Sequence, residues 1–195
     1  MLTVITAAES YDIATLAAVK AALGITGTAE DLTLPPLISR ASAAIATACN
    51  RVLVEETVEE TVRDARCGIM LQRYPVTSVT TVTEDGTGLV PADYEADLGC
   101  GIIERLRSDS VGCWARGRTV IRYRAGYTLE TMPPDIVQAL VMVVAQFRSQ
   151  AARDPLLRAE ETTDVERLEW QVGIDDGIPA SVRALLVDHR RPAGA

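Results

Sequence analysis

The sequence has 195 residues, a length that suits one domain of ordinary size or one domain with an inserted subdomain. Hydrophobic residues make up 48% and charged residues 24%, which is typical of a folded globular protein and argues against wholesale disorder. The formal net charge of −8 repels nucleic-acid phosphates, so dedicated DNA binding is not expected.

Neither export nor membrane insertion is predicted. Residues 1–9 lack the basic and apolar regions of a secretory signal, and the longest apolar run, residues 139–145, is far shorter than a membrane span. We therefore expect a soluble protein that is made in the cytoplasm and has no membrane partner.

Two helices are predicted in the N-terminal quarter. Apolar residues recur at helical spacing over residues 13–23, and Gly24 is placed to end that helix. A second apolar stripe covers residues 37–48. Pro35 and Pro36 indicate that this helix either begins or kinks there, because proline fits the first turn of a helix but not its interior.

The residues that follow change to a period of two, which indicates β-strands. A turn signal at residues 84–88 reads as a β-hairpin. Several short strands with turns between them favour an antiparallel sheet or a small barrel. The predicted strands cover residues 54–62, 75–83, 89–94, 102–103 and 119–124.

Charged residues alternate along two of these strands. Four arginines at even positions would project to one face of an extended segment. That face is interpreted as a solvated strand face or a subunit interface paired with acids, and a DNA groove is less favoured. Four glutamates, in two adjacent pairs, are interpreted as an exposed strand that keeps a sheet edge soluble. The arginines are Arg116, Arg118, Arg122 and Arg124; the glutamates are Glu55, Glu56, Glu59 and Glu60.

The helical pattern returns after Pro133. Residues 136–147 leave almost no polar face, and a helix that is apolar all round is buried all round. We expect it to be either a central helix or one that neighbouring subunits cover. Residues 151–164 are polar and read as a linker, a short strand is possible over residues 169–174, and a short amphipathic helix follows at Val182 to Leu186.

The predicted fold class is therefore α+β, with a helical core and an antiparallel β subdomain. The core consists of two N-terminal helices, one apolar central helix and a short C-terminal helix. The expected segments are residues 1–52 for the N-terminal part of the core, 53–127 for the β subdomain, 128–150 for the central helix, and 151–195 for a linker and C-terminal docking segment.

Catalytic and metal-binding motifs are missing from the sequence. His189 is the only histidine, so one chain cannot build a His-based triad or a multi-histidine metal site. A G-x-S-x-G elbow, a phosphate-binding G-x-x-x-x-G-K-[ST] loop and an H-E-x-x-H motif are all missing. We predict no catalytic, cofactor-binding or metal residues and no enzymatic activity; a carboxylate enzyme around Glu56 and Glu60 is the least favoured alternative.

Five segments in order resemble the head–tail connector, or adaptor, proteins of long-tailed phages and gene transfer agents. The most specific is VIRYRAGY at residues 120–127, which is similar to the family's "V.V.Y.AGY" strand before a proline and an apolar helix. The others are the opening helix with its acidic turn at residues 13–31, the helix ending at residues 48–53, the YPVTSVTTV strand at residues 74–82, and the closing residues 178–190.

The resemblance implies a structural subunit of the particle neck. Such adaptors form a ring, commonly twelve-fold, beneath the portal protein; they extend the DNA channel and present a platform for a stopper or tail-completion protein. DNA would pass without specific binding. Phage and gene transfer agent both remain open as the parent particle.

Two surfaces are assigned as candidates on this basis. The portal-docking candidates are Val182, Leu185, Leu186 and Arg190, although a C-terminal helix that folds back on its own core is an equal alternative. The subunit-interface candidates are Arg122, Arg124, Val141, Val144 and Phe147. The alternative function is a small-ligand or peptide-binding α+β module, which would need an apolar pocket with a few convergent polar groups.

Overall fold

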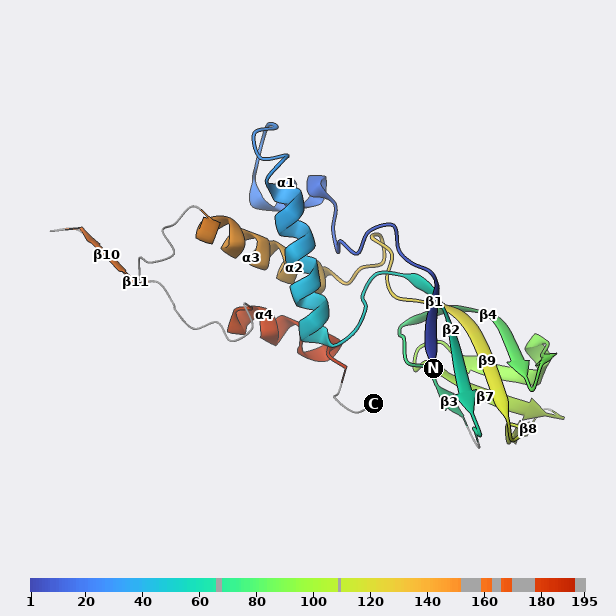
Figure 1. Ribbon diagram of the computed structural model, residues 1–195. Coiled ribbons are helices and arrows are strands. Elements are labelled where there is room, and N and C mark those ends of the chain that lie inside the picture. Colours follow the sequence, from blue (N-terminus) through green and yellow to red (C-terminus); the bar gives the residue numbers. More distant parts are fainter. Residues whose placement is uncertain (66–67, 109, 152–158, 163–165, 170–177, 192–195) are drawn as a thin grey trace. The chain divides into compact units, whose positions relative to one another are not determined.

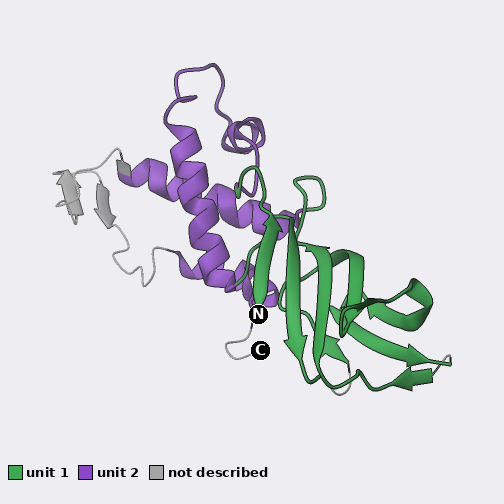
Figure 2. Ribbon diagram, turned by 45° about the vertical axis from the view of Figure 1, so that its right-hand side comes forward, with its two compact units in different colours: residues 1–11, 51–131, 193–195 green, residues 12–50, 132–192 purple. Residues whose placement is uncertain are grey.

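The computed structural model describes residues 1–65, 68–108, 110–151, 159–162, 166–169 and 178–191 (Figure 1). The chain divides into two compact units, coloured separately in Figure 2. Unit 1 contains Met1–Tyr11 and Arg51–Thr131, and unit 2 contains Asp12–Asn50 and the described residues from Met132 onward. The chain thus enters unit 1, leaves it for two helices, returns to it, and then passes back to unit 2, which holds the last described residues.

Unit 1 contains a five-stranded antiparallel sheet in the order β1-β2-β9-β4-β5. Alternate residues of β2 and β9 are buried, as the period of two predicts. The strands are β1 (Leu2–Thr6), β2 (Glu56–Arg63), β4 (Val76–Glu84), β5 (Thr87–Gly88) and β9 (Arg118–Ala125).

A four-stranded antiparallel sheet completes unit 1. Its strands β3, β7 and β6 are neighbours in that order, and β8 pairs with β7. Side chains from both sheets form one buried cluster, which includes Val58, Ile103, Ile121 and Tyr123. The strands are β3 (Ile69–Met70), β6 (Tyr94–Asp97), β7 (Ile102–Arg107) and β8 (Ser110–Gly112).

Two sequence predictions for this region, a hairpin turn and the strand after it, can be compared with the structure. The hairpin turn is confirmed, because Asp85 and Gly86 both have positive φ angles, 49° and 84°, between β4 and β5. The predicted strand over residues 89–94 is wrong. Pro91–Asp93 form a 3-10 turn, in which the Val90 N–H donates to Asp93 Oδ2 at 3.1 Å, and β6 begins only at Tyr94.

The assignment of residues 1–52 to the helical part also needs correction. Leu2–Thr6 form β1, which pairs with β2 and belongs to unit 1. The signal was present in the sequence, since LTVIT is rich in β-branched residues, but five residues are too few to show a period. This added strand turns β2 from the expected edge into an internal strand.

Unit 2 is helical. Gly24 adopts a left-handed conformation (φ 67°) and ends the first helix, as predicted, and Pro35 and Pro36 lie in the first turn of the second. The helices are α1 (Leu16–Leu23), α2 (Leu34–Cys49), α3 (Pro134–Ala151) and α4 (Ala180–Leu185), and Val187–His189 form a 3-10 turn.

Helix α3 is the centre of unit 2, because it contacts α1, α2 and α4. Ile136, Leu140 and Val143 are fully buried, whereas Val137 and Val141 are half-buried. The helix was expected to be either central in its own chain or covered by neighbouring subunits. Within its own chain, the other helices of unit 2 already bury most of its apolar surface.

A separate pair of strands begins within residues 151–164, which were expected to form a linker, and ends beyond them. Strands β10 (Ala159–Thr162) and β11 (Glu166–Glu169) pair antiparallel with each other. The strand that was expected over residues 169–174 lies almost wholly outside the described residues.

Candidate assembly surfaces

The outer face of β2 and β9 is a ladder of paired charges. Arg122 Nη2 donates to Glu59 Oε2 at 2.9 Å, and Arg124 Nη2 donates to Glu55 Oε1. Both acids belong to the same chain, so the pairs form within one subunit, and the role of Arg122 and Arg124 in a subunit interface stays a prediction. Each pair is partly exposed and contributes at most about 1 kcal/mol, so the ladder mainly neutralises the face.

The other two glutamates of β2 point the opposite way. Glu56 and Glu60 are buried, with 4% and 2% of their surface exposed, so the interpretation of the whole row as an exposed strand is wrong for them. Because side chains alternate along a strand, adjacent glutamates must lie on opposite faces. The burial of one face follows from the tertiary packing of the two sheets.

The buried glutamates form a polar network inside unit 1. Glu60 Oε2 accepts hydrogen bonds from the Tyr123 hydroxyl at 2.9 Å and from the Gln72 backbone N–H at 3.0 Å. The Tyr123 hydroxyl also accepts from the Arg73 backbone N–H at 3.2 Å, and the Arg73 guanidinium pairs with Glu56 at 3.1 Å. The network ties β2 and β9 to the segment that follows β3.

Burial raises the pKa of Tyr123 well above its usual value, and the negative charge of Glu60 adds to the rise. The hydroxyl therefore remains a hydrogen-bond donor, which is the role that the buried carboxylate requires. The Glu60 carboxylate accepts hydrogen bonds from the protein and Glu56 is paired with Arg73, so the geometry favours a role in stabilising the fold.

A second buried ion pair connects the two sheets. Arg105 on β7 donates from Nε to Glu84 Oε2 on β4 at 3.1 Å, and Glu84 Oε1 accepts from the Ala115 N–H at 2.7 Å. Both residues are at most 9% exposed. Arg105 also lies 3.6 Å from Asp93, and Glu84 lies 3.6 Å from Arg107, so the pair is the centre of a small charged cluster between β4 and β7.

The VIRYRAGY segment has a structural explanation at Gly126. Its φ is 112°, and a Cβ there would lie 2.6 Å from the Val54 carbonyl oxygen. The close approach allows the Tyr127 N–H to donate to Leu53 O at 2.7 Å and the Glu55 N–H to donate to Tyr127 O at 2.9 Å. The glycine is therefore required where the end of β9 runs beside the residues that lead into β2.

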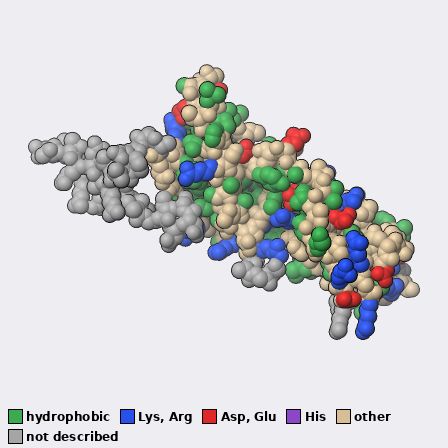
Figure 3. Space-filling view, in the orientation of Figure 1, with side chains coloured by type: hydrophobic (Ala, Val, Ile, Leu, Met, Phe, Trp, Pro, Cys, Tyr) green, Lys and Arg blue, Asp and Glu red, His purple; other side chains and the backbone are tan. Residues whose placement is uncertain are grey.

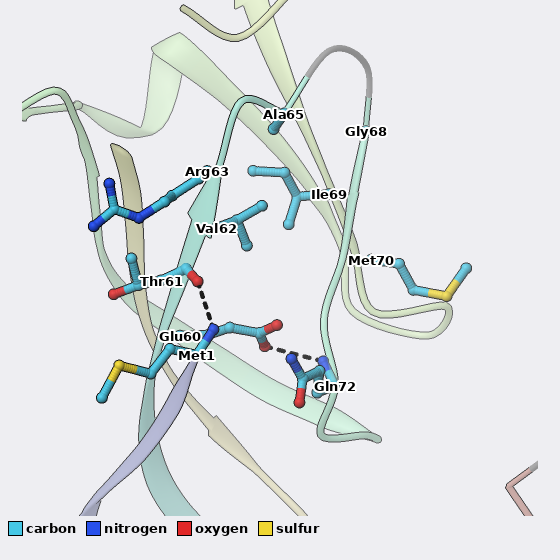
Figure 4. Close-up of a pocket in the computed structure, with 10 residues that line it drawn as sticks. All are labelled: Met1, Glu60, Thr61, Val62, Arg63, Ala65, Gly68, Ile69, Met70 and Gln72. Atoms are coloured by element: carbon cyan, nitrogen blue, oxygen red, sulfur yellow. Dashed lines mark hydrogen bonds between the residues drawn. The ribbon is translucent and has the colours of Figure 1, made fainter. Parts of the chain in front are cut away.

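A pocket of about 440 Å³ lies between β2 and residues 68–72 (Figure 4). Val62 and Ile69 point toward each other there, while Met70 and Arg63 point away from them. The one buried carboxylate of its lining, Glu60, already accepts two hydrogen bonds from the protein. Because this carboxylate is engaged within the protein, the pocket gives little support to a small-ligand module.

The C-terminal segment packs onto unit 2. Val182 is fully buried and Leu186 is 3% exposed, so for these two of the docking candidates the structure has a helix that folds back on its own core. Leu185 is half-buried and Arg190 is exposed. Portal docking by this segment stays a prediction. It now depends on the side chains of the segment that do not pack onto unit 2, such as Leu185 and Arg190.

His189 fastens the end of this segment. Its Nε2 lies 2.5 Å from Asp135 Oδ2, at the start of α3. Burial acts to raise the pKa of Asp135, but the bonds from His189 and from the Ile136 N–H outweigh it and lower the pKa overall. The sequence alone offered no signal for this pair, because the two residues are 54 positions apart.

The candidate interface residues of α3 also divide into buried and partly exposed side chains. Val144 is fully buried and Phe147 is 6% exposed, with the Arg40 guanidinium 4.3 Å from the Phe147 ring centroid. Val141 is half-buried. Of the three, Val141 is the one with surface left for a neighbouring subunit.

Two further classes of site were searched among the described residues. No group of three or more His, Cys, Asp or Glu side chains there is placed to hold a metal ion. No helix in that part of the chain is long and apolar enough to cross a membrane.

Comparisons with solved structures give the same fold over the whole chain. One match is a chain from the neck of an empty GTA (gene transfer agent) particle computed with C6 symmetry: 23% identity, TM-score 0.62, covering 100% of this chain and 98% of that one. A second is from the neck of a native GTA particle computed with C12 symmetry, with 21% identity, TM-score 0.62 and the same coverage. At these identities the likeness establishes the fold.

A third match is a chain from the virion of a native gene transfer agent particle, with 22% identity, TM-score 0.61 and again 100% and 98% coverage. No curated protein matches the sequence. The model of the head completion protein family matches residues 12–192, which is nearly the whole chain. The chain therefore belongs to the head completion protein family.

Proposed function

We propose that this protein is a structural, non-enzymatic subunit of the neck that joins the head of a tailed particle to its tail. Membership of the head completion family over residues 12–192 is the observation that supports this most strongly. The likeness to chains from GTA necks, at 98% coverage of each, agrees with it. The subunits form a ring beneath the portal protein and extend the DNA channel.

A twelve-fold ring is the proposed assembly. The similar chains come from necks computed with C6 and C12 symmetry, and both symmetries are compatible with twelve copies. The charge distribution fits a channel through which DNA slides, because the chain is acidic and Arg122 and Arg124 are each neutralised by a carboxylate. These two paired arginines would then hold DNA only weakly.

The outward side of the C-terminal segment is the proposed portal contact. Val182 and Leu186 anchor the segment to unit 2, which leaves Leu185, Arg190 and the 64% exposed Val187 facing outward. A stopper or tail-completion protein would bind elsewhere on the ring. Deleting the whole segment would expose the core of unit 2, so point changes on the outward side are the better test.

The direct experiment is to quantify the proteins of intact tailed particles by mass spectrometry against the portal. We expect this chain at about the copy number of the portal. Its absence from intact particles would contradict the proposal. For docking, Val187→Asp with Arg190→Glu should abolish portal binding while circular dichroism stays unchanged; Ser181→Asp, at another exposed position of the segment, is the matched control.

A further inference from the structure

Two arginines of unit 1 stand directly opposite each other with no acid between them. Arg63 at the end of β2 is the cross-strand partner of Arg118 at the start of β9, and Arg116 lies just before them. All three are exposed, and no described residue forms an ion pair with any of them. Figure 3 shows Lys and Arg side chains, with Asp and Glu side chains among them, over unit 1 at the lower right of the view. Like charges directly opposite destabilise a sheet.

The backbone beneath these arginines is well fixed. Gly117 has a φ of 140°, its carbonyl accepts from the Asp64 N–H at 2.9 Å, and the Arg118 N–H donates to Asp85 Oδ1 at 3.2 Å. One carboxylate oxygen of Asp85 therefore already accepts a hydrogen bond from a backbone N–H. We call Arg63, Arg116 and Arg118 the arginine patch.

The other sheet has the opposite arrangement. Glu95 on β6 is the cross-strand partner of Glu104 on β7, and Asp97 follows on the same face. These carboxylates and the half-buried Ile102 line an open hollow of about 240 Å³, which we call the acidic hollow. No described cation pairs with them. The Cys100 N–H donates to Asp97 Oδ1 at 3.0 Å and lowers the pKa of that carboxyl, so it is ionised at neutral pH.

The hollow suits a guanidinium better than a metal ion. No described group of acids in this protein is placed to hold a metal. An arginine side chain, in contrast, can lay its aliphatic stem on Ile102 and present its planar fork to the surrounding carboxylates. The shape and charge of the hollow therefore match the residues of the arginine patch.

The two patches cannot satisfy each other within one copy. Arg63 and Arg118 lie on the side of the five-stranded sheet that faces away from the shared core, since their strand neighbours Val62 and Thr119 have the opposite orientation. Glu95 and Glu104 lie on the outer side of the four-stranded sheet, opposite the buried Ile103. The patches therefore lie on opposite outer faces of unit 1.

From this arrangement we propose that the arginine patch of one copy binds the acidic hollow of the next. The contact is heterologous, because two different patches of the same chain meet, and repeated heterologous contacts close into a ring. The repulsion between like charges in each cross-strand pair destabilises the isolated subunit. It is relieved when copies assemble. The inference deepens the proposed ring by naming the surfaces that join its subunits.

The test uses two charge-reversal variants of the full chain. One carries Arg63→Glu with Arg118→Glu, and the other carries Glu95→Arg with Glu104→Arg. Sedimentation velocity at low salt should show that each variant self-associates at least about tenfold more weakly than the parent. An equimolar mixture should recover association, because each reversed patch then meets its complement. Association should also weaken as salt rises.

A control matched in charge to the Glu95→Arg, Glu104→Arg variant is Glu9→Arg with Glu130→Arg, which reverses two other exposed acids of unit 1. It should assemble like the parent. A second readout separates assembly from folding: Arg63→Glu alone places opposite charges across the strands, so its Tm should rise by about 1–2 °C while self-association falls.

The outcomes are distinct from those of the neck proposal. Reversal variants that assemble as the parent does would overturn this interface but leave the ring intact. A parent chain that stays monomeric at about 1 mM in low salt would also overturn it, since the charge attraction would be too weak. The neck proposal is judged separately, by the copy number of the chain in intact particles.

Discussion

The two units of this protein are stabilised by different chemistry. Unit 2 is built on aliphatic burial: α3 presents Ile136, Leu140 and Val143 to the helices around it, and its charged contacts lie at the surface. Unit 1 combines an apolar cluster with buried carboxylates, since Glu56 and Glu60 lie inside the unit with Tyr123 and Arg73. The apolar core tolerates small shifts, whereas the polar network requires a defined register of strands.

The largest loss of stability is expected from a substitution that strains the backbone of unit 1. Gly126→Ala would place a Cβ 2.6 Å from a backbone oxygen at a φ of 112°, and we expect a loss of about 4 kcal/mol or more. Hydrogen exchange should show lost protection in β2, β4 and β9. The control is Gly86→Ala, which has a φ of 84° but no atom within 4 Å, and it should cost about 1 kcal/mol. Equal effects would show that close approach is unimportant.

The aliphatic core of unit 2 should respond next. Leu140→Ala removes a fully buried side chain of α3, and we expect a loss of about 3 kcal/mol in the free energy of unfolding. Val141→Ala, one position along on the half-buried side, should cost about 1 kcal/mol. Urea unfolding followed by circular dichroism at 222 nm measures both. If Val141→Ala proved as damaging, the two sides of α3 would be equally buried.

The polar network of unit 1 gives a third contrast. Glu60→Ala leaves the Tyr123 hydroxyl and the Gln72 N–H buried without an acceptor, so we expect a loss of about 2 kcal/mol. Glu59→Ala on the same strand breaks only an exposed pair and should cost less than about 1 kcal/mol. Emission from Trp114, which is buried in unit 1, reports the transition in a Trp170→Phe background. Comparable losses would contradict a structural role for the network.

The smallest effect concerns pH and unit 2. The folded protein lowers the pKa of Asp135 below its ordinary value of 3.8, so the bond to His189 stabilises the fold above that value and is lost as the pH falls through the lower, folded-state pKa. Asp135 is partly exposed, so we expect only about 0.5 kcal/mol. Tm measured from pH 3 to 6 should therefore differ between the parent and Asp135→Asn near pH 6 and converge near pH 3. Parallel curves would argue against the pair.

Much of the secondary structure followed from local signals. Gly24 and the Pro35–Pro36 pair placed two helix ends, and the Asp85–Gly86 turn placed a hairpin, because each of these residues restricts its own backbone. Local signals misled at residues 89–94, where a strand was expected to follow the hairpin turn and Pro91 instead began a 3-10 turn. At Leu2–Thr6 the β-branched segment was too short to reveal the period of a strand.

The candidate surfaces were less predictable. Spacing placed Arg122 and Arg124 on one face, but which acids they meet depended on the register of β2 against β9. The cross-strand pairs Arg63–Arg118 and Glu95–Glu104 depend on register in the same way. A shift of one residue would move each side chain to the opposite face, so no reading of single strands could have found them.

The sequence by itself determined the α+β class, the positions of the main helices and the resemblance to head–tail connectors, because these depend on residues close together in the chain. Only the tertiary structure decided that Glu56 and Glu60 are buried, that β1 covers β2, and that His189 meets Asp135. Those facts come from contacts between distant segments. Burial and pairing are properties of the packed arrangement, whereas turn and helix signals are properties of the local backbone.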